Sequence, residues 1–396
     1  MEYVQAERMK AFPFSGIRAV LEKANKMQQA GEHVIHLEIG RPDFDTPEKI
    51  KKAAEASLAA GHVFYTSNYG TPELRRTIAA FEKRFNGIDY DPSEVMVTVG
   101  VGEGTYDGMA GFLNPGDEVL IPNPVWLNYM NVPRSLGAVP VNYHLLEENH
   151  FQIDFEEMEG LITEKTKMIV IVDPSNPTGG VFSRETLERV AELAKKHDLL
   201  VLSDEIYEQL TYDGEKHISI ASLPGMKERT IKLSGVSKAY SMTGWRLGYM
   251  CAPKEIIEVC VRMHQQTITC ASSFVQDATV TALTECDRDV EAMRLEYERR
   301  KNFLISALNA IDGLSTNDPK GAFYIFVNIK SFGLTSYEMA EYLLNEAKVA
   351  MVPGSAFGSA GEGYLRLSYA TAYEELVEAA KRIREALGKL KEKKAD

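Results

Sequence analysis

Hydrophobic and polar residues follow two different periods along the middle of the chain. Five short runs are filled by Val, Ile and Leu with little alternation, which is typical of strands buried on both faces of a sheet. These runs are residues 94–99, 118–122, 168–173, 199–204 and 230–234. Between several of them apolar residues recur every three or four positions, as in residues 183–198, which predicts amphipathic helices. Strands and helices in alternation predict βαβ units and a mostly parallel sheet between helices, an α/β fold.

Three of the predicted helix starts carry the signature of an N-cap. Thr46 and Thr71 each precede a proline, and Ser183 precedes an acidic first turn. Ser and Thr side chains accept hydrogen bonds from the first free N–H groups of a helix, and proline is tolerated at the first helical position. We therefore expect helices that begin directly after these three residues.

The pattern changes after about residue 285. A long charged stretch that starts D-R-D-V-E-A-M-R-L-E-Y-E-R-R predicts an amphipathic helix. Residues 321–328 and 363–368 then predict strands, and residues 373–390 a closing helix. We expect a large domain over residues 46–285, and a smaller α+β domain over residues 286–396 that is joined by an N-terminal arm, residues 1–45.

Composition and charge exclude several classes of protein. The 396 residues are 44% hydrophobic and 26% charged, which is ordinary for a globular protein. The net charge of −13 lacks the basic footprint of a nucleic-acid binder. There is no run of about 18 apolar residues, so the sequence predicts no membrane partner, and the charged N-terminus does not resemble a signal peptide.

Cysteine and histidine usage adds two expectations. The four cysteines have no C-x-x-C spacing, and the eight histidines form no motif such as H-E-x-x-H. The sequence therefore predicts reduced thiols in a cytoplasmic protein, and no metal site.

Residues with useful chemistry follow each of the five predicted strands. The first strand is followed by G-V-G-E-G-T, the second by N-P-V-W with Trp126, and the third by P-S-N-P-T-G-G with Asn176. The fourth ends in S-D-E-I-Y, and the fifth leads into a segment with a lysine and an arginine. In open α/β sheets ligands bind beyond the carboxyl ends of the strands, so we expect all these groups in one site.

This set of groups points to one kind of cofactor. A glycine-rich helix start and an arginine suit a phosphate, and a tryptophan suits a flat aromatic ring. A carboxylate holds the proton of a pyridinium nitrogen, and a lysine condenses with an aldehyde. Together they predict pyridoxal 5'-phosphate, although a lone lysine is more often only a solvated charge, and G-V-G-E-G does not match a phosphate-binding fingerprint.

Six motifs, taken in order, resemble those of the class I/II (aspartate aminotransferase-like) family of pyridoxal-phosphate enzymes. They are G-R-P-D-F-D-T-P, Y-T-S-N-Y-G-T-P-E-L-R, D-P-S-N-P-T-G, S-D-E-I-Y, S-K-A-Y-S-M-T-G-W-R-L-G-Y and Y-L-R-L-S-Y-A. The resemblance spans residues 12–385. It implies fold type I, with a mostly parallel seven-stranded sheet in the large domain. It also implies a homodimeric aminotransferase that passes an amino group from an amino acid to a 2-oxo acid.

The resemblance implies roles around the cofactor ring. Lys238 forms the covalent link to the cofactor aldehyde, and Asp204 pairs with the ring nitrogen. Tyr207 and Asn176 hydrogen-bond the phenolic oxygen of the ring, and Trp126 stacks on the ring and borders the substrate.

Further implied roles concern the phosphate. The N–H groups of Val101 and Gly102 hold it together with Arg246, and Tyr65 reaches the phosphate of the neighbouring subunit. Gly235 stands where many relatives carry a phosphate-binding serine, so Ser237 or Ser234 is expected to take its place.

The implied substrate site holds the α-carboxylate between Arg366, Asn176 and the Gly40 N–H group. The helix sequence T-Y-D-G-M-A-G-F-L has no basic residue to pair with a second carboxylate, and the covering segment F-P-F-S-G-I-R is mostly apolar. An unpaired buried carboxylate is costly, so aromatic or aliphatic amino donors are favoured, with 2-oxoglutarate as acceptor. Aspartate stays open as a donor, because Arg18 or Arg41 could turn into the pocket.

Two other functions share the fold. One is a β-eliminating C–S lyase with the same cofactor, and the other is the non-enzymatic aminotransferase-like half of a transcription regulator. Three further tyrosines near these motifs, Tyr69, Tyr129 and Tyr240, have no assigned role, and we interpret them as packing residues.

Overall fold

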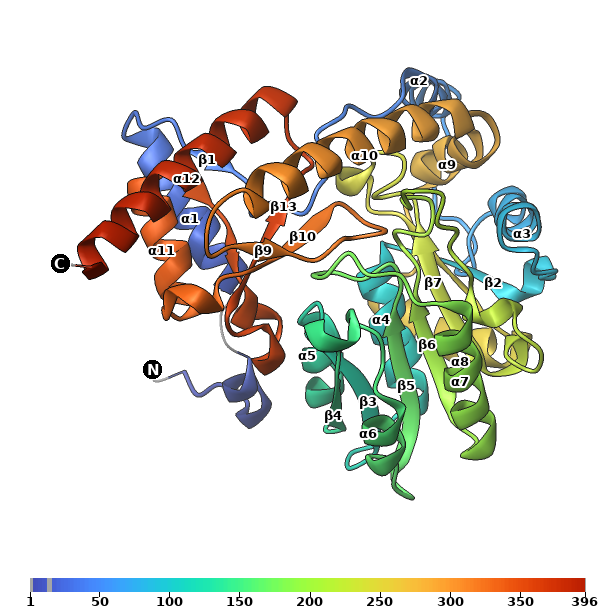
Figure 1. Cartoon of the computed structure of the whole chain (residues 1–396). Coiled ribbons are helices and arrows are strands. Elements are labelled where there is room, and N and C mark those ends of the chain that lie inside the picture. The colour runs from blue at the N-terminus through green and yellow to red at the C-terminus, as the bar shows by residue number, and fades with distance from the viewer. Residues whose placement is uncertain (1–2, 13–15, 396) are drawn as a thin grey trace.

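The computed structural model describes residues 3–12 and 16–395 and contains a large seven-stranded sheet (Figure 1). Its strand order is β2-β8-β7-β6-β5-β3-β4. The strands are β2 (Val95–Thr98), β3 (Glu118–Asn123), β4 (Val139–His144), β5 (Thr166–Val172), β6 (Leu200–Asp204), β7 (Thr230–Gly235) and β8 (Gly248–Cys251). All neighbours pair in parallel except β8, which is antiparallel to β2 and β7. The five predicted strands are all present within two residues, and the mostly parallel sheet is confirmed.

Helices cover both faces of this sheet. They are α2 (Glu48–Ala59), α3 (Pro72–Asn86), α4 (Val101–Phe112), α5 (Asn128–Ser135), α6 (Phe155–Gly160), α7 (Arg184–Lys196), α8 (Lys254–Thr267) and α9 (Ser273–Glu285). In β5, Ile169 and Ile171 pack with side chains of α6 and α7, whereas Met168 and Val170 pack with side chains of α4 and α8. Successive residues of a strand point to opposite faces, so a strand covered on both sides needs an unbroken apolar run.

Two of the three predicted N-caps are present. Thr71 accepts a hydrogen bond from the Leu74 N–H at 3.3 Å, and Ser183 accepts one from the Thr186 N–H at 3.1 Å. The prediction for Thr46 is wrong, because α2 begins at Glu48 without a side-chain cap. The Thr46 hydroxyl instead donates to the Ser241 carbonyl at 2.6 Å and accepts from the indole N–H of Trp245 at 3.1 Å. Thr46 therefore fixes the loop after β7.

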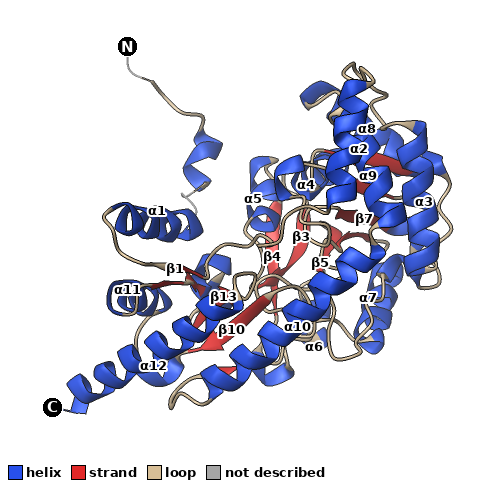
Figure 2. Cartoon of the chain, turned by 90° about the horizontal axis from the view of Figure 1, so that it is seen from above, coloured by secondary structure: helices blue, strands red, loops and turns tan. Residues whose placement is uncertain are grey.

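A second, smaller set of elements lies beside the large sheet (Figure 2). It contains α1 (Gly16–Gln29), α10 (Asp287–Asn309), α11 (Ser336–Glu346) and α12 (Tyr373–Ala395), with the strands β1 (Ile35–His36), β9 (Ser315–Thr316), β10 (Tyr324–Asn328), β11 (Val349–Ala350), β12 (Val352–Pro353) and β13 (Tyr364–Ser368). Four of these strands form a sheet in the order β12-β13-β10-β9, and β1 pairs in parallel with β11. The predicted late strands and the closing helix are present. The domain boundaries at residues 46 and 285 stay a prediction.

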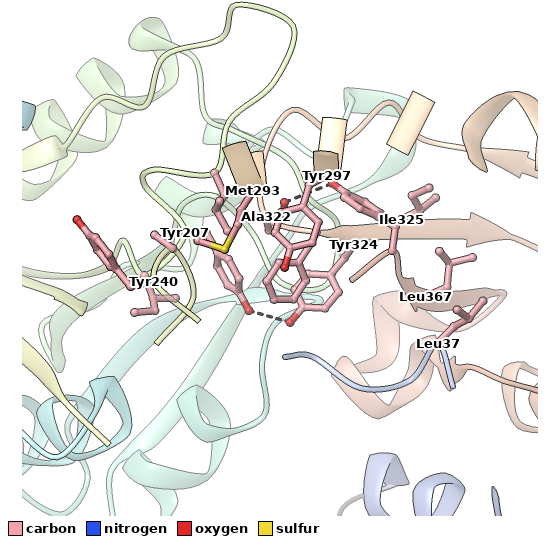
Figure 3. Close-up of a cluster of buried hydrophobic side chains, with 14 of the residues drawn as sticks. Leu37, Tyr207, Tyr240, Met293, Tyr297, Ala322, Tyr324, Ile325 and Leu367 are labelled. Carbon is pink, nitrogen blue, oxygen red and sulfur yellow. Dashed lines mark hydrogen bonds between the residues drawn. The ribbon is translucent and has the colours of Figure 1, made fainter. Parts of the chain in front are cut away.

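One hydrophobic core runs through both parts of the chain (Figure 3). Tyr207 follows β6 and Tyr324 lies on β10, and their hydroxyl groups are hydrogen-bonded at 2.7 Å. Leu37 and Leu367 belong to the same buried cluster. The two parts are therefore packed against each other. Among the described helices, none is both long and apolar enough to cross a membrane.

Candidate active site

A cavity of about 360 Å³ lies at the carboxyl ends of the large sheet's strands, closed on one side by β10 and β13. This volume is within the range of small-molecule sites. The sequence-predicted residues that line it are Gly40, Val101, Gly102, Trp126, Asn176, Asp204, Tyr207, Ser237, Lys238, Arg246 and Arg366. The structure thus brings together residues that are far apart in the sequence.

Lys238 projects into this cavity from the loop after β7. Its Nζ donates a hydrogen bond to the Gly40 carbonyl at 2.8 Å. Burial, and after it the charge of Arg366, lowers the pKa of Lys238 to about 8. A lysine with such a pKa has an appreciable neutral fraction near neutral pH, as a nucleophilic or proton-accepting amine requires.

Asp204 ends β6 and is buried beside the cavity. One oxygen accepts a hydrogen bond from the Tyr129 hydroxyl at 2.5 Å, and the other accepts one from the Ile206 N–H at 3.1 Å. Burial raises the pKa of Asp204 to about 6, whereas the Tyr129 hydrogen bond lowers it. A carboxylate in this setting can hold a proton on a cationic ring nitrogen.

The interpretation of Tyr129 as packing is incomplete, because this tyrosine is buried in the core and also lines the cavity and donates to Asp204. One signal in the sequence could have found it. Tyr129 comes three residues after Trp126, and its N–H group donates to the Trp126 carbonyl at 3.1 Å. Residues three apart in a helical turn lie on the same face. Tyr324 was also missed, since it comes from the small sheet.

Arg366 lies on β13 with its guanidinium buried between two aromatic rings. Its Cζ atom is 4.5 Å from the centre of the Tyr324 ring and 4.9 Å from that of Phe357. The guanidinium donates to the Glu38 carbonyl at 2.6 Å and to the Asn176 side-chain oxygen at 3.2 Å, and its Nε has no partner. Burial lowers the pKa of Arg366, yet a guanidinium is basic enough to stay charged. A buried cation with an unused donor suits a carboxylate ligand.

The start of α4 and Arg246 form an anion-binding corner. Gly100 precedes the helix with a φ of 82°, and a Cβ on it would lie 2.6 Å from Nη2 of Arg246. Only glycine therefore leaves the arginine in contact with the backbone at this turn. The unpaired N–H groups of the first helical turn and the guanidinium together suit a phosphate.

The structure also gives a reason for Gly235, which stands where many members of the resembled family carry a serine. Gly235 pairs with Gly248 across β7 and β8, and a Cβ on Gly235 would lie 2.8 Å from the Gly248 Cα. No side chain fits between these strands. Of the two substitutes considered, Ser237 lines the cavity, whereas the Ser234 hydroxyl donates to Glu208 at 2.5 Å on the other side of the strand.

Three other residues considered in the sequence analysis, Tyr65, Arg41 and Arg18, lie at different places relative to the cavity. Tyr65 is 88% exposed and does not line the cavity of its own chain. Arg41 lines the cavity, whereas Arg18 is an exposed residue of α1 that does not. Residues 13–15 of the expected covering segment lie outside the described residues.

The donor set as a whole fits pyridoxal 5'-phosphate. The start of α4 after Gly100 lies beside the Arg246 guanidinium and suits a phosphate, the carboxylate of Asp204 is buried beside the cavity and suits a cationic ring nitrogen, and Lys238 supplies an amine. The unused Nε of Arg366 remains for a second, carboxylate-bearing molecule.

Comparison with known proteins identifies the family. The chain belongs to the class I and II aminotransferases, whose family model matches residues 32–383. It is 48% identical to aromatic-amino-acid aminotransferase 2 of Thermococcus litoralis over 94% of this chain and 96% of that protein. It is also 48% identical to an aspartate aminotransferase of Pyrococcus abyssi, over 94% of this chain and 95% of that protein.

Solved structures of aminotransferases are similar to this chain along nearly its whole length. The crystal structure of an aromatic aminotransferase from Pyrococcus horikoshii is 46% identical with a TM-score of 0.89, covering 93% of this chain and 99% of that chain. The aspartate aminotransferase of Thermus thermophilus with maleate is 39% identical with a TM-score of 0.93, covering 97% and 100%. The protein is therefore a pyridoxal-phosphate-dependent amino-acid aminotransferase of fold type I.

We expect the Tyr129→Phe substitution to raise the pKa of Asp204 above about 6, because burial still raises it and the opposing hydrogen bond is lost. A larger fraction of Asp204 is then protonated at a given pH, so the acidic limb of the pH profile of kcat/KM moves to higher pH. The matched control is Tyr143→Phe, which removes a buried hydroxyl bonded to the Val170 carbonyl outside the cavity. If both variants keep the wild-type limb, the Tyr129 hydrogen bond does not set this pKa.

Proposed function

We propose that Lys238, Asp204 and Arg366 carry the amino-group transfer, and that the favoured donors are aromatic or aliphatic amino acids with 2-oxoglutarate as acceptor. The observation behind this proposal is that an amine of lowered pKa, a buried carboxylate and a buried guanidinium line one cavity. Each of the three meets a different need of the reaction.

Bound pyridoxal phosphate supplies an aldehyde that condenses with amines and a cationic ring that withdraws electrons from the substrate α-carbon. Lys238 would hold the cofactor through Nζ, and as a neutral amine the same Nζ would accept the proton from the α-carbon of the substrate. Asp204 keeps the ring nitrogen protonated. Arg366 fixes the α-carboxylate, with Asn176, Trp126 and the Gly40 N–H group beside it.

The remaining predicted residues position the cofactor. Tyr207 is buried and its pKa is raised by burial and by Tyr324, so the neutral phenol can donate to the phenolic oxygen of the ring together with Asn176. Trp126 covers the ring face. The phosphate is assigned to the α4 start at Val101 and Gly102, and to the two side chains Ser237 and Arg246.

The wall of the cavity supports neutral donors. The residues of α4 that line it are Val101, Gly102 and Thr105, and none of them carries a charge. A carboxylate buried against this wall would lack a partner there. Relatives named as aromatic and as aspartate aminotransferases are almost equally similar to this chain, so the wall is the stronger guide to its donors.

The other two functions have less support. Relatives that match nearly the whole chain are named aminotransferases, which does not favour a C–S lyase or a non-enzymatic regulator. We also propose a cytoplasmic location, because all four cysteines are free thiols.

We further propose that the enzyme is a homodimer in which Tyr65 reaches the phosphate of the neighbouring subunit. Val63, Phe64 and Tyr65 are 57%, 80% and 88% exposed. They border a surface hollow with Cys270 and Phe274. A contiguous exposed apolar patch of this kind is typical of a protein interface, and two-fold dimers are the most common assembly.

Lys238→Ala should lose both the visible absorbance of lysine-bound cofactor and measurable turnover, because no other amine lines the described cavity. Absorbance spectra of the purified proteins and a transamination assay measure the two losses. The control is Lys254→Ala, at an exposed lysine of α8. Turnover of Lys238→Ala near the wild-type rate would remove this lysine from the site.

A screen of the standard amino acids with 2-oxoglutarate tests the donor class. We expect neutral apolar and aromatic donors to give the highest kcat/KM, measured by formation of the corresponding keto acid. The uncharged-wall argument fails if kcat/KM for aspartate exceeds that for every neutral donor by about 100-fold, which corresponds to roughly 2.7 kcal/mol of preferential transition-state stabilisation.

Tyr65→Phe should raise the dissociation constant of pyridoxal phosphate by about 10- to 100-fold, since a hydrogen bond to a charged group is lost. Equilibrium dialysis measures the constant, and sedimentation should still give a dimer. Tyr337→Phe, at a 51% exposed tyrosine of α11, is the control. A fully active monomer in sedimentation would contradict the shared site.

A further inference from the structure

The cavity contains one cation to which no function has been given. Among the described residues that line it, the cationic side chains are Arg41, Lys238, Arg246 and Arg366. Lys238 donates to the Gly40 carbonyl, Arg246 to the Thr243 and Val99 carbonyls, and Arg366 to Glu38 and Asn176. Within the described part of the chain Arg41 makes no hydrogen bond and no ion pair, and it is exposed. Among these four lining cations, Arg41 is the one that has neither a protein partner nor an assigned ligand.

The backbone that carries Arg41 is fixed on both sides. The carbonyl of Gly40 accepts the Lys238 hydrogen bond, and a Cβ on Gly40 would lie 2.5 Å from the Tyr324 hydroxyl. Two residues after Arg41, both carboxylate oxygens of Asp43 accept hydrogen bonds from Arg300 at 2.8 and 2.9 Å. Arg41 therefore starts from a defined point next to Lys238, while its own side chain keeps its freedom.

Among the described residues that line the cavity, no free carboxylate competes for the Arg41 guanidinium. Asp204 supplies the carboxylate among the described lining residues, and it is buried and bonded to Tyr129. Dicarboxylic substrates such as glutamate, aspartate and 2-oxoglutarate bring a second carboxylate besides the one assigned to Arg366. An arginine fork matches a carboxylate in two parallel hydrogen bonds, and a long exposed side chain can also turn to solvent when the substrate side chain is apolar.

We propose that Arg41 pairs with the distal carboxylate of dicarboxylic substrates and so lets one cavity accept both dicarboxylic and neutral amino acids. This inference rests on the proposed amino-group transfer with Arg366 at the α-carboxylate. It explains how an uncharged α4 wall is compatible with 2-oxoglutarate as acceptor. Arg18 is excluded from the role, since it does not line the cavity.

The test compares two substrate classes in the cofactor-loaded enzyme with Arg41→Gln. Single half-reactions with glutamate, aspartate, leucine and phenylalanine are followed separately by the absorbance of the cofactor. We expect kcat/KM for the two acidic donors to fall by about 10- to 100-fold and that for the neutral donors to change by less than about threefold. Arg41→Lys should retain part of the preference, because it keeps the charge and loses the fork.

Equilibrium binding gives a second readout that does not need turnover. In isothermal titration calorimetry, Arg41→Gln should weaken maleate, a dicarboxylate, by about 10- to 100-fold and leave the monocarboxylate 3-phenylpropionate within about threefold. Arg18→Gln is the matched control and should resemble the wild type in both assays.

The outcomes separate this inference from the proposed function. Equal losses for both substrate classes, or a selective loss in Arg18→Gln in place of Arg41→Gln, would overturn the role of Arg41. A wild-type enzyme that processes none of the donors would instead overturn the proposed amino-group transfer. The maleate titration would still test whether Arg41 binds a distal carboxylate.

Discussion

A buried lysine, Lys232, fixes the end of β6 and the turn after it, which supply Asp204 and Tyr207 to the cavity. Its Nζ on β7 donates to Glu82 of α3 at 2.7 Å and to Glu208 at 2.9 Å, and lies 3.6 Å from Glu205. Although burial opposes it, the Lys232 charge helps to lower the pKa of Glu205 to about 2. Breaking such a network by removing one partner costs about 3–5 kcal/mol, since charges would be left unpaired and buried. In the segment S-D-E-I-Y-E, residues 203–208, Glu205 and Glu208 interact with Lys232 and so fix the backbone. Asp204, in the same segment, lines the cavity.

The strands predicted from the sequence are ones in which burial leaves an apolar run, although the short strand β8, buried at all four positions, was not predicted. The five predicted strands are rich in Val, Ile and Leu, with little alternation of polar residues, because helices cover both faces of the sheet. The strand β4 (Val139–His144) was not predicted, since it lies at the edge of the sheet, is only partly buried and contains Pro140. The cap at Thr46 failed for another reason. Its hydroxyl is used by Ser241 and Trp245, almost 200 positions away, and local sequence cannot report a partner so distant.

The candidate site was predictable to the extent that strand ends determine it. Asp204 ends a strand of the large sheet, and Trp126, Asn176 and Lys238 each follow a strand of the same sheet, so the topology alone brings them together. The contacts that tune them were not predictable in this way. Tyr324 meets Tyr207 across 117 positions and from a different sheet, which no periodicity in either segment indicates. The roles of the lining residues rest on the resemblance and stay predictions.

Charge balance connects these observations. The chain has a net charge of −13, yet its cavity is lined by four cations and by one buried carboxylate among the described residues. The ligands of an aminotransferase, a phosphate and one or two carboxylates, are the anions that would neutralise this excess. Arg366 and Arg246 both lower the pKa of Lys238, after burial as the largest cause. The charges that attract the anions thus also favour the neutral amine at the point where the reaction needs it.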